Sequence, residues 1–213
     1  MQESLRVGVA VFNAGDYRAA HEAWEEPWLG LDSGTADERL LHGLIQYAAA
    51  VHHARGRNWS GAQGLAASAA EYLSDLDDDY RDMNVGDVRG RLRRLAADPE
   101  FAERRRPLPL RHEGAELTPR VLSFAEVASA AALLAEEYDA FDESVVDDAV
   151  RYARAELDGD SDSTLASDRS RGFPGMLFEF AADRERRAVV YDRLRAHVER
   201  RRSRERDVSG LFD

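Results

Sequence analysis

Apolar side chains recur every three or four residues along most of the chain, which is the period of amphipathic helices. In the stretch that follows Asn58, apolar residues keep this spacing as far as Leu73. Residues 108–117, centred on Glu113-Gly114, depart from the pattern and suggest a small hairpin. The pattern therefore predicts an all-α protein, a compact helical bundle with a helical C-terminal extension.

Residues that commonly cap helices mark several of the predicted helix starts. Thr35 and Ser123 each precede a Glu by three residues, which is the spacing of a capping box, and Asn58 stands before an apolar periodic stretch. Gly15 breaks the pattern between the first two helices. The predicted helices cover residues 4–12, 16–28, 35–55, 58–76, 85–95, 123–138, 143–157 and 175–206.

Changes in composition divide the chain into five predicted parts. Prolines interrupt the helical pattern around residue 107, and Gly, Asp and Ser dominate a stretch near residue 165, which is typical of a flexible linker. The expected parts are a helical bundle (1–98), a proline-containing connector (99–119), a helical hairpin (120–157), a flexible linker (158–172), and a C-terminal helix and tail (173–213).

The second predicted helix carries an aromatic stripe that includes a histidine. Tyr17, His21, Trp24 and Trp28 are spaced i, i+4, i+7 and i+11, so they share one face. Such a stripe predicts that Trp24 and Trp28 pack inside the bundle. The half-buried imidazole of His21 then needs hydrogen-bond partners, and Glu25 lies one turn further on.

The third predicted helix carries a polar line beside its apolar face. Glu38, His42 and Gln46 follow one another at intervals of four residues. If the second and third helices are antiparallel and their polar edges are adjacent, His21, Glu25, His42 and Gln46 come together. We therefore expect one polar cluster between the two helices.

Three ordered motifs resemble the helical Domain of Unknown Function 309 family. They are Phe12-Asn-Ala-Gly-Asp-Tyr17, His21-Glu-Ala-Trp-Glu-Glu-Pro-Trp28 and Gly43-Leu-Ile-Gln46, followed by Arg55-Gly-Arg-Asn58. The resemblance covers about Ser4 to Leu76. It implies a compact helical domain, and its signature helix would contain His21, Glu22, Glu25 and Trp28, with Gln46 in the facing helix.

This chain departs from the family pattern at two positions. His42 replaces the usual Gln before Gly43, which could alter a ligand preference, and Arg57 interrupts the usual Arg-Gly-Asn turn, which lengthens a loop. The family has no established reaction. The resemblance therefore implies a fold rather than an activity, and no catalytic residue is assigned.

The polar cluster allows three interpretations. We favour a hydrogen-bond network that fixes the register of two helices; a small-molecule pocket and a metal site are the alternatives. His21 and Glu25 are the candidate metal ligands, but the motif lacks the second His of a His-Glu-x-x-His site. We predict no stoichiometric metal and no cofactor. The candidate ligand-binding residues are His21, Glu22, Glu25, Trp28, His42 and Gln46.

The charge composition indicates adaptation to high salt. All 29 basic residues are Arg, there is no Lys, and 41 acidic residues give a net charge of −12. An acidic surface without Lys fits a cytoplasm that holds molar salt, so we expect a halophilic source and a cytoplasmic location. There is no Cys, which excludes disulfides and thiolate metal sites.

The sequence disfavours two classes of partner, a membrane and a nucleic acid. No apolar run is long enough for a membrane helix, and no signal-peptide pattern begins the chain, so a membrane partner is not expected. The last predicted helix is rich in Arg, but interleaved acids and the scarcity of aromatics disfavour nucleic acid. We expect those arginines to be solvated or to pair with acids of the same chain. The sequence leaves open whether the chain forms a homo-oligomer.

Two other features receive conservative interpretations. His52 and His53 are adjacent, and their side chains point about 100° apart on a helix, so they do not readily share one ligand. The run Asp77–Asp79 is expected to be a solvated helix end, because it lacks the glycine and distal Glu of a calcium loop.

Three functions are compatible with these sequence features, and we give them in order of preference. The first is a non-catalytic binding or scaffold module that uses the polar cluster. The second is a metal-dependent enzyme, for example a hydrolase, in which His21 and Glu25 are the metal ligands and Glu22 is the catalytic base. The third is a nucleic-acid-associated protein that acts through the arginine-rich last helix.

Overall fold

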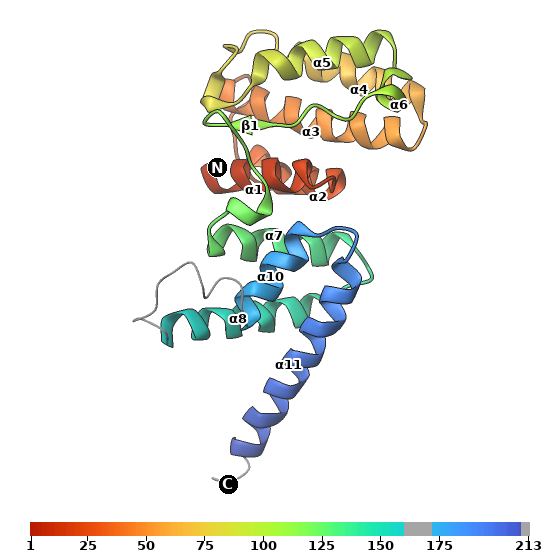
Figure 1. The fold of residues 1–213 in the computed structure, drawn as a ribbon. Helices are drawn as coiled ribbons and strands as arrows, with labels where there is room; N and C mark the ends of the chain where they lie inside the picture. The colour runs from red at the N-terminus through yellow and green to blue at the C-terminus, as the bar shows by residue number, and fades with distance from the viewer. Residues whose placement is uncertain (160–171, 210–213) are drawn as a thin grey trace. The chain divides into compact units, whose positions relative to one another are not determined.

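A computed structural model describes residues 1–159 and 172–209 as an almost entirely helical protein. The chain divides into two compact units, Met1–Leu122 and Ser123–Asp213. Figure 1 shows the succession of helices within each unit. The predicted all-α fold class is confirmed.

The first unit is a bundle in which successive helices pack side by side. The middle helix α3 (Ala36–Arg55) packs against both α2 (Tyr17–Leu29) and α4 (Trp59–Tyr72) (Figure 1). The flanking helices α1 (Gln2–Asn13) and α5 (Val85–Ala97) pack on α2 and α4 respectively, and the short α6 is Phe101–Arg104. Short 3₁₀ turns cover Tyr80–Asp82 and Pro119–Val121.

Trp24 is fully buried where α1 and α2 cross, as its place in the aromatic stripe predicts. A Cβ atom at Gly8 would lie only 2.2 Å from the indole Nε1, so the lack of a side chain at Gly8 makes room for the ring. Trp28 is different, because it is only partly buried. The prediction of an interior position was wrong for Trp28, whose Nε1 instead donates to Glu38 at the edge of the bundle.

The predicted helix caps are confirmed by hydrogen bonds. Thr35 Oγ1 accepts from the Glu38 backbone N–H at 3.3 Å, and Asn58 Oδ1 accepts from that of Gly61 at 3.1 Å. Ser123 forms a complete capping box with Glu126. These caps satisfy backbone donors that a helix start leaves free, so local sequence determines where α3, α4 and α7 (Phe124–Glu137) begin.

The predicted hairpin is present, and it packs onto the bundle. Strands β1 (Arg111–His112) and β2 (Ala115–Glu116) pair antiparallel around Glu113 and Gly114, both of which have positive φ as a two-residue hairpin turn requires. Asn13 of α1 donates to the carbonyls of Leu110 and Leu117, both at 2.8 Å. The bundle and the connector therefore form one compact unit, although the sequence suggested a division near residue 98.

The second unit consists of α7, α8 (Glu143–Gly159), α10 (Gly172–Ala182) and α11 (Arg187–Ser209). The prediction of one continuous helix over 175–206 was wrong, because the helix breaks at residues 183–186. The buried Arg187 explains the break: its guanidinium Nε donates to the Phe180 carbonyl at 2.8 Å, at the end of α10. The guanidinium thus satisfies a carbonyl that the helix end leaves without a partner.

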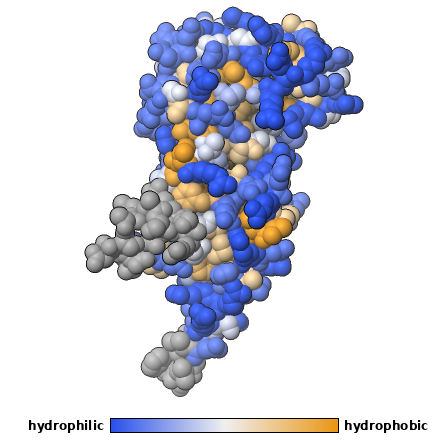
Figure 2. All heavy atoms as spheres, viewed as in Figure 1, coloured by the Kyte–Doolittle hydropathy of each residue, from blue (hydrophilic) through white to orange (hydrophobic). Residues whose placement is uncertain are grey.

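Some expectations concern residues outside the described ranges. The predicted linker 158–172 lies mostly there, since residues 160–171 are not described, and so does the end of the C-terminal tail from residue 210. Within the described residues, no helix combines the length and apolar character that spanning a membrane requires. The face shown in Figure 2 is largely hydrophilic.

Candidate functional site

The polar residues of interest lie along the seam between α2 and α3. The two helices are antiparallel, because Trp28 at the end of α2 contacts Glu38 at the start of α3. At the other end of the seam, His21 of α2 and His53 of α3 line the same pocket. The helical periodicity of both segments therefore places two successive groups of polar side chains along one interface.

The first group, which we call the Glu38 network, is centred on a nearly buried carboxylate. The Glu38 side chain is only 11% exposed, and its Oε1 accepts from Trp28 Nε1 at 3.0 Å and from His42 Nδ1 at 3.2 Å. Its Oε2 accepts from the Gly34 backbone N–H at 3.2 Å. Gln46 and Tyr72 complete the network by contacting the imidazole of His42.

The hydrogen bonds assign a direction to this network. An ionised carboxylate can only accept, so His42 Nδ1 carries a hydrogen and donates it to Glu38. His42 Nε2 then accepts from Gln46 Nε2, which lies 3.0 Å away. The imidazole is also held between rings, because it stacks on Tyr72 with 3.8 Å between centroids and lies 4.7 Å from Trp28.

The same contacts explain the titration of Glu38. Burial alone would raise the pKa of this carboxyl, because it penalises the charged form. The hydrogen bonds from Trp28, from the Gly34 N–H and from His42 outweigh burial and leave the pKa below its ordinary value. Glu38 is therefore held as a carboxylate that links α2, the loop after it and α3.

The second group begins with the signature residues of α2. His21 Nδ1 lies 3.1 Å from Glu22 Oε1 and 3.7 Å from Glu25 Oε2, and the three side chains are between 30% and 49% exposed. Each offers one ligand atom, and these atoms lie within 4.8 Å of one another. The arrangement could present one imidazole nitrogen and two carboxylate oxygens to a metal ion such as zinc or manganese.

The expectation of a single cluster was wrong. Among the hydrogen bonds of the described residues, none joins His21 or Glu25 to His42 or Gln46. Gln46 bonds along its own helix to His42 rather than across to His21, because an i, i+4 partner lies within reach. Its Oε1 is buried and accepts no hydrogen bond from the described residues.

A pocket of about 280 Å³ opens beside His21. We call it the His21 pocket. It is lined by Tyr17, Arg18, His21, Glu22, Ala49, His52 and His53. Of the candidate residues from the sequence, only His21 and Glu22 line it; Trp28 and His42 belong to the Glu38 network.

Sequence reasoning missed the contribution of the adjacent histidines of α3. The rings of His52 and His53 are nearly perpendicular, with centroids 6.0 Å apart, as expected for neighbours on a helix. Both side chains nevertheless line the same pocket, which extends over two neighbouring positions of α3. Burial, and next the nearby His53 and Arg18, lower the pKa of His52. The available signal was their place at the end of α3 that faces the start of α2.

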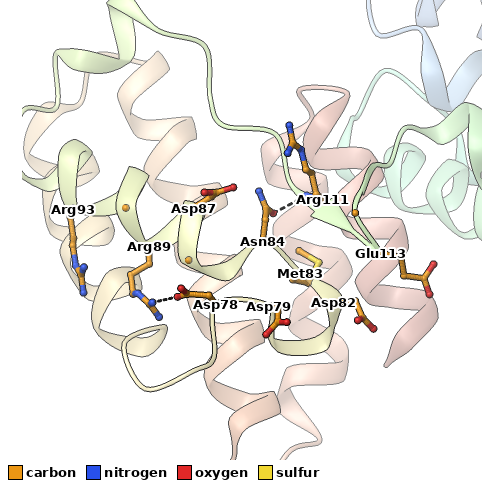
Figure 3. A pocket seen from close by; sticks show the side chains of 13 residues that line it. Asp78, Asp79, Asp82, Met83, Asn84, Asp87, Arg89, Arg93, Arg111 and Glu113 are labelled. Atoms are coloured by element: carbon orange, nitrogen blue, oxygen red, sulfur yellow. Dashed lines mark hydrogen bonds and ion pairs between the residues drawn. The ribbon is translucent and has the colours of Figure 1, made fainter.

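Asp78 and Asp79 line a second depression, of about 660 Å³, in the first unit. Figure 3 shows Asp82, Asp87 and Glu113 beside them, and Arg89, Arg93 and Arg111 among the same residues. Asp78 pairs with Arg89, and Asn84 accepts a hydrogen bond from the Arg111 backbone N–H at 2.8 Å. The mixture of acids and arginines indicates local charge compensation rather than a cation site.

Arginines of α11 form ion pairs with acids in their own unit. Arg193 pairs with Glu179, Arg195 with Asp192, Arg201 with Glu205, and Arg202 with Asp148. This agrees with the expectation that the basic strip pairs with acids of the same chain. Four of its arginines are thus engaged without a nucleic acid.

Comparison with known proteins supports the resemblance seen in the motifs. Residues 5–65 match the model of the Domain of unknown function (DUF309) family. An uncharacterized protein of Aquifex aeolicus (strain VF5) is 29% identical over 99 residues, which are 46% of this chain. The match spans 29% of that protein's length. The segment that matches the family model contains all residues of the His21 pocket and all of the Glu38 network except Tyr72.

Proposed function

We propose that this protein is a non-catalytic binding module whose ligand site is the His21 pocket. The observation that carries the proposal is the gathering of Arg18 and three histidines around one open pocket at the α2–α3 seam. Such a concave site with a few convergent polar groups is the usual form of a small-molecule site. The Glu38 network at the other end of the seam would hold the two helices in the register that the pocket needs.

The different roles of the two ends of the seam are inferred from the hydrogen bonding and the exposure of their side chains. In the Glu38 network, both nitrogens of His42 and both oxygens of Glu38 already bond within the protein. These atoms therefore stabilise the fold through hydrogen bonds within the protein. In the His21 pocket the histidines are partly or largely exposed, so they can exchange water for a ligand.

The test is a binding experiment with probes of different charge. Glucose, putrescine and inorganic phosphate would be titrated into the full chain while NMR follows the imidazole signals. The proposal expects saturable shifts at His21, His52 or His53 with at least one probe. Binding should disappear in Ala49→Phe, which fills the pocket, and persist in the matched Ala67→Phe on the exposed side of α4. Absence of any saturable shift, or shifts that survive Ala49→Phe, would refute it.

One observation favours a second candidate function, a metal-dependent enzyme. The ligand atoms of His21, Glu22 and Glu25 lie close enough for one ion. In that case His21 and Glu25 would be the ligands of the ion, and Glu22 would be the base that takes a proton from an ion-bound water in a hydrolytic reaction. Metal content, treated in the Discussion, separates the two candidates.

We also infer that the protein works in a cytoplasm rich in salt. The support is the composition: 41 acidic residues and 29 arginines without a Lys. Dilution from molar salt to about 0.1 M would strengthen repulsion between carboxylates, because the screening length grows from about 3 Å to about 10 Å. The melting temperature should therefore fall on dilution, and a constant or rising value in a salt series would contradict this inference.

A further inference from the structure

We propose that the His21 pocket binds a phosphate group, either as the free ion or as a small phosphate monoester. This deepens the proposed function and rests on it. The pocket gathers Arg18, His52 and His53 in a chain whose net charge is −12. A concentration of cationic or hydrogen-donating side chains on such a background indicates an anionic ligand.

The hydrogen bonds around His53 prepare it as a donor. Asn58 Oδ1 accepts from the Gly61 N–H, which fixes the orientation of the amide, so Asn58 Nδ2 is the donor in its 2.8 Å contact with His53 Nδ1. His53 Nδ1 therefore accepts. In the neutral imidazole the hydrogen must then be on Nε2, so His53 carries an N–H donor without needing a charge.

His21 is also oriented by its neighbours. Its Nδ1 contacts Glu22 at 3.1 Å, and because the carboxylate accepts, the hydrogen lies on Nδ1. Glu22 is the one carboxylate among the residues that line the pocket, and this contact directs it toward His21. The remaining lining groups that can carry charge are basic side chains and the phenol of Tyr17.

The electrostatics of His52 agree with this geometry. Burial is the largest cause of its lowered pKa, and the next causes are the charges of His53 and Arg18. An additional positive charge is thus disfavoured on this side of the pocket when no counter-ion is present. The negative charge of a phosphate group would compensate the positive charge on this side of the pocket. Arg suits phosphate because its planar guanidinium can donate two parallel hydrogen bonds.

The experiment compares phosphate binding in the full chain and in matched variants. Inorganic phosphate and glycerol 3-phosphate would be titrated separately at constant molar KCl, with NMR following the histidine signals. Arg18→Gln removes a guanidinium charge from the pocket, and His53→Gln removes an imidazole. Arg94→Gln and His197→Gln make the same changes at side chains outside it.

We expect saturable shifts at His52, and an affinity about tenfold weaker or worse in each pocket variant, as loss of a charge-assisted hydrogen bond implies. The control variants should bind as the wild type does. Tighter binding of glycerol 3-phosphate would identify a monoester as the ligand class, and equal or tighter binding of the free ion would identify phosphate itself.

The proposal is overturned if neither compound gives saturable shifts, or if both pocket variants bind like the controls. Arg18 is exposed and His53 is partly exposed, so both should tolerate substitution, and unchanged melting temperatures of the variants would verify folding. If glucose or putrescine fills the pocket while phosphate does not, the phosphate inference fails and the binding module stands. If none of the probes binds, both fail.

Discussion

The two ends of the α2–α3 seam use similar residue types in opposite ways. Each end combines a histidine with glutamate, but Glu38 is 11% exposed and accepts from three donors, whereas Glu22 and Glu25 are 49% and 39% exposed. A buried carboxylate must be fully paired to be tolerated, and an exposed one need not be. The same pairing of histidine with glutamate therefore stabilises the fold at one end and leaves side chains available to a ligand at the other.

The largest expected effect concerns the core face of α2, which underlies both ends. Trp24→Ala should lower the free energy of unfolding by about 3–5 kcal/mol, because it empties a fully buried aromatic site against Gly8. Trp28→Ala should cost less, since Trp28 is only partly buried. Denaturant unfolding at fixed high salt measures both. A loss below about 1 kcal/mol for Trp24 would show that α2 is packed differently.

The next largest effect is a pH-dependent loss of stability that we expect at the Glu38 end of the seam and not at the His21 end. Glu38→Gln should cost about 1–3 kcal/mol at pH 7, because it weakens a buried acceptor with three donors. The folded-state pKa of Glu38 is lowered, so its contribution is fully present above the unfolded pKa, near 4.5, and is lost as pH falls through the folded pKa.

The difference in stability between wild type and Glu38→Gln should therefore shrink as pH is lowered below about 4.5. Unfolding curves of both proteins between pH 7 and pH 3 measure it. Glu25→Gln, at the exposed end, is the control and should show little loss at any pH in that range. A pH-independent cost for Glu38→Gln would contradict the assignment of an ionised Glu38.

A smaller effect is expected from His21→Gln. His21 is partly exposed and contacts exposed carboxylates, so its loss should change the free energy of unfolding by less than about 1 kcal/mol. Elemental analysis of untagged protein, purified without a chelator, should find no stoichiometric transition metal in either protein. About one ion per wild-type chain that is lost in His21→Gln would instead favour the metal-dependent enzyme.

Local sequence predicted the features that depend on neighbouring residues. The caps at Thr35, Asn58 and Ser123 and the turn at Glu113-Gly114 need only residues a few positions away. The polar line of α3 was likewise visible as an interval of four residues, and its members bond to one another.

Features that depend on tertiary contacts were not predictable in the same way. Residues 183–186 read Asp-Arg-Glu-Arg and contain no glycine or proline that would mark a break, while apolar residues keep a helical spacing on both sides. The break is explained by a tertiary contact, in which the buried Arg187 at the start of α11 donates to the Phe180 carbonyl of α10. The His21 pocket depends on which turn of α3 faces the start of α2. Periodicity identifies the face of each helix but not this register, so the sequence joined His21 to Gln46 and missed His52 and His53.

We infer that the Glu38 network maintains the fold, while the side chains of the His21 pocket are available to a ligand. The most direct test measures the free energies of unfolding of His42→Gln and His52→Gln side by side in denaturant. We expect a loss of about 1–3 kcal/mol for His42→Gln, which leaves buried partners unsatisfied, and a change within about 0.5 kcal/mol for His52→Gln. Equal losses, or a larger loss for His52→Gln, would contradict the account.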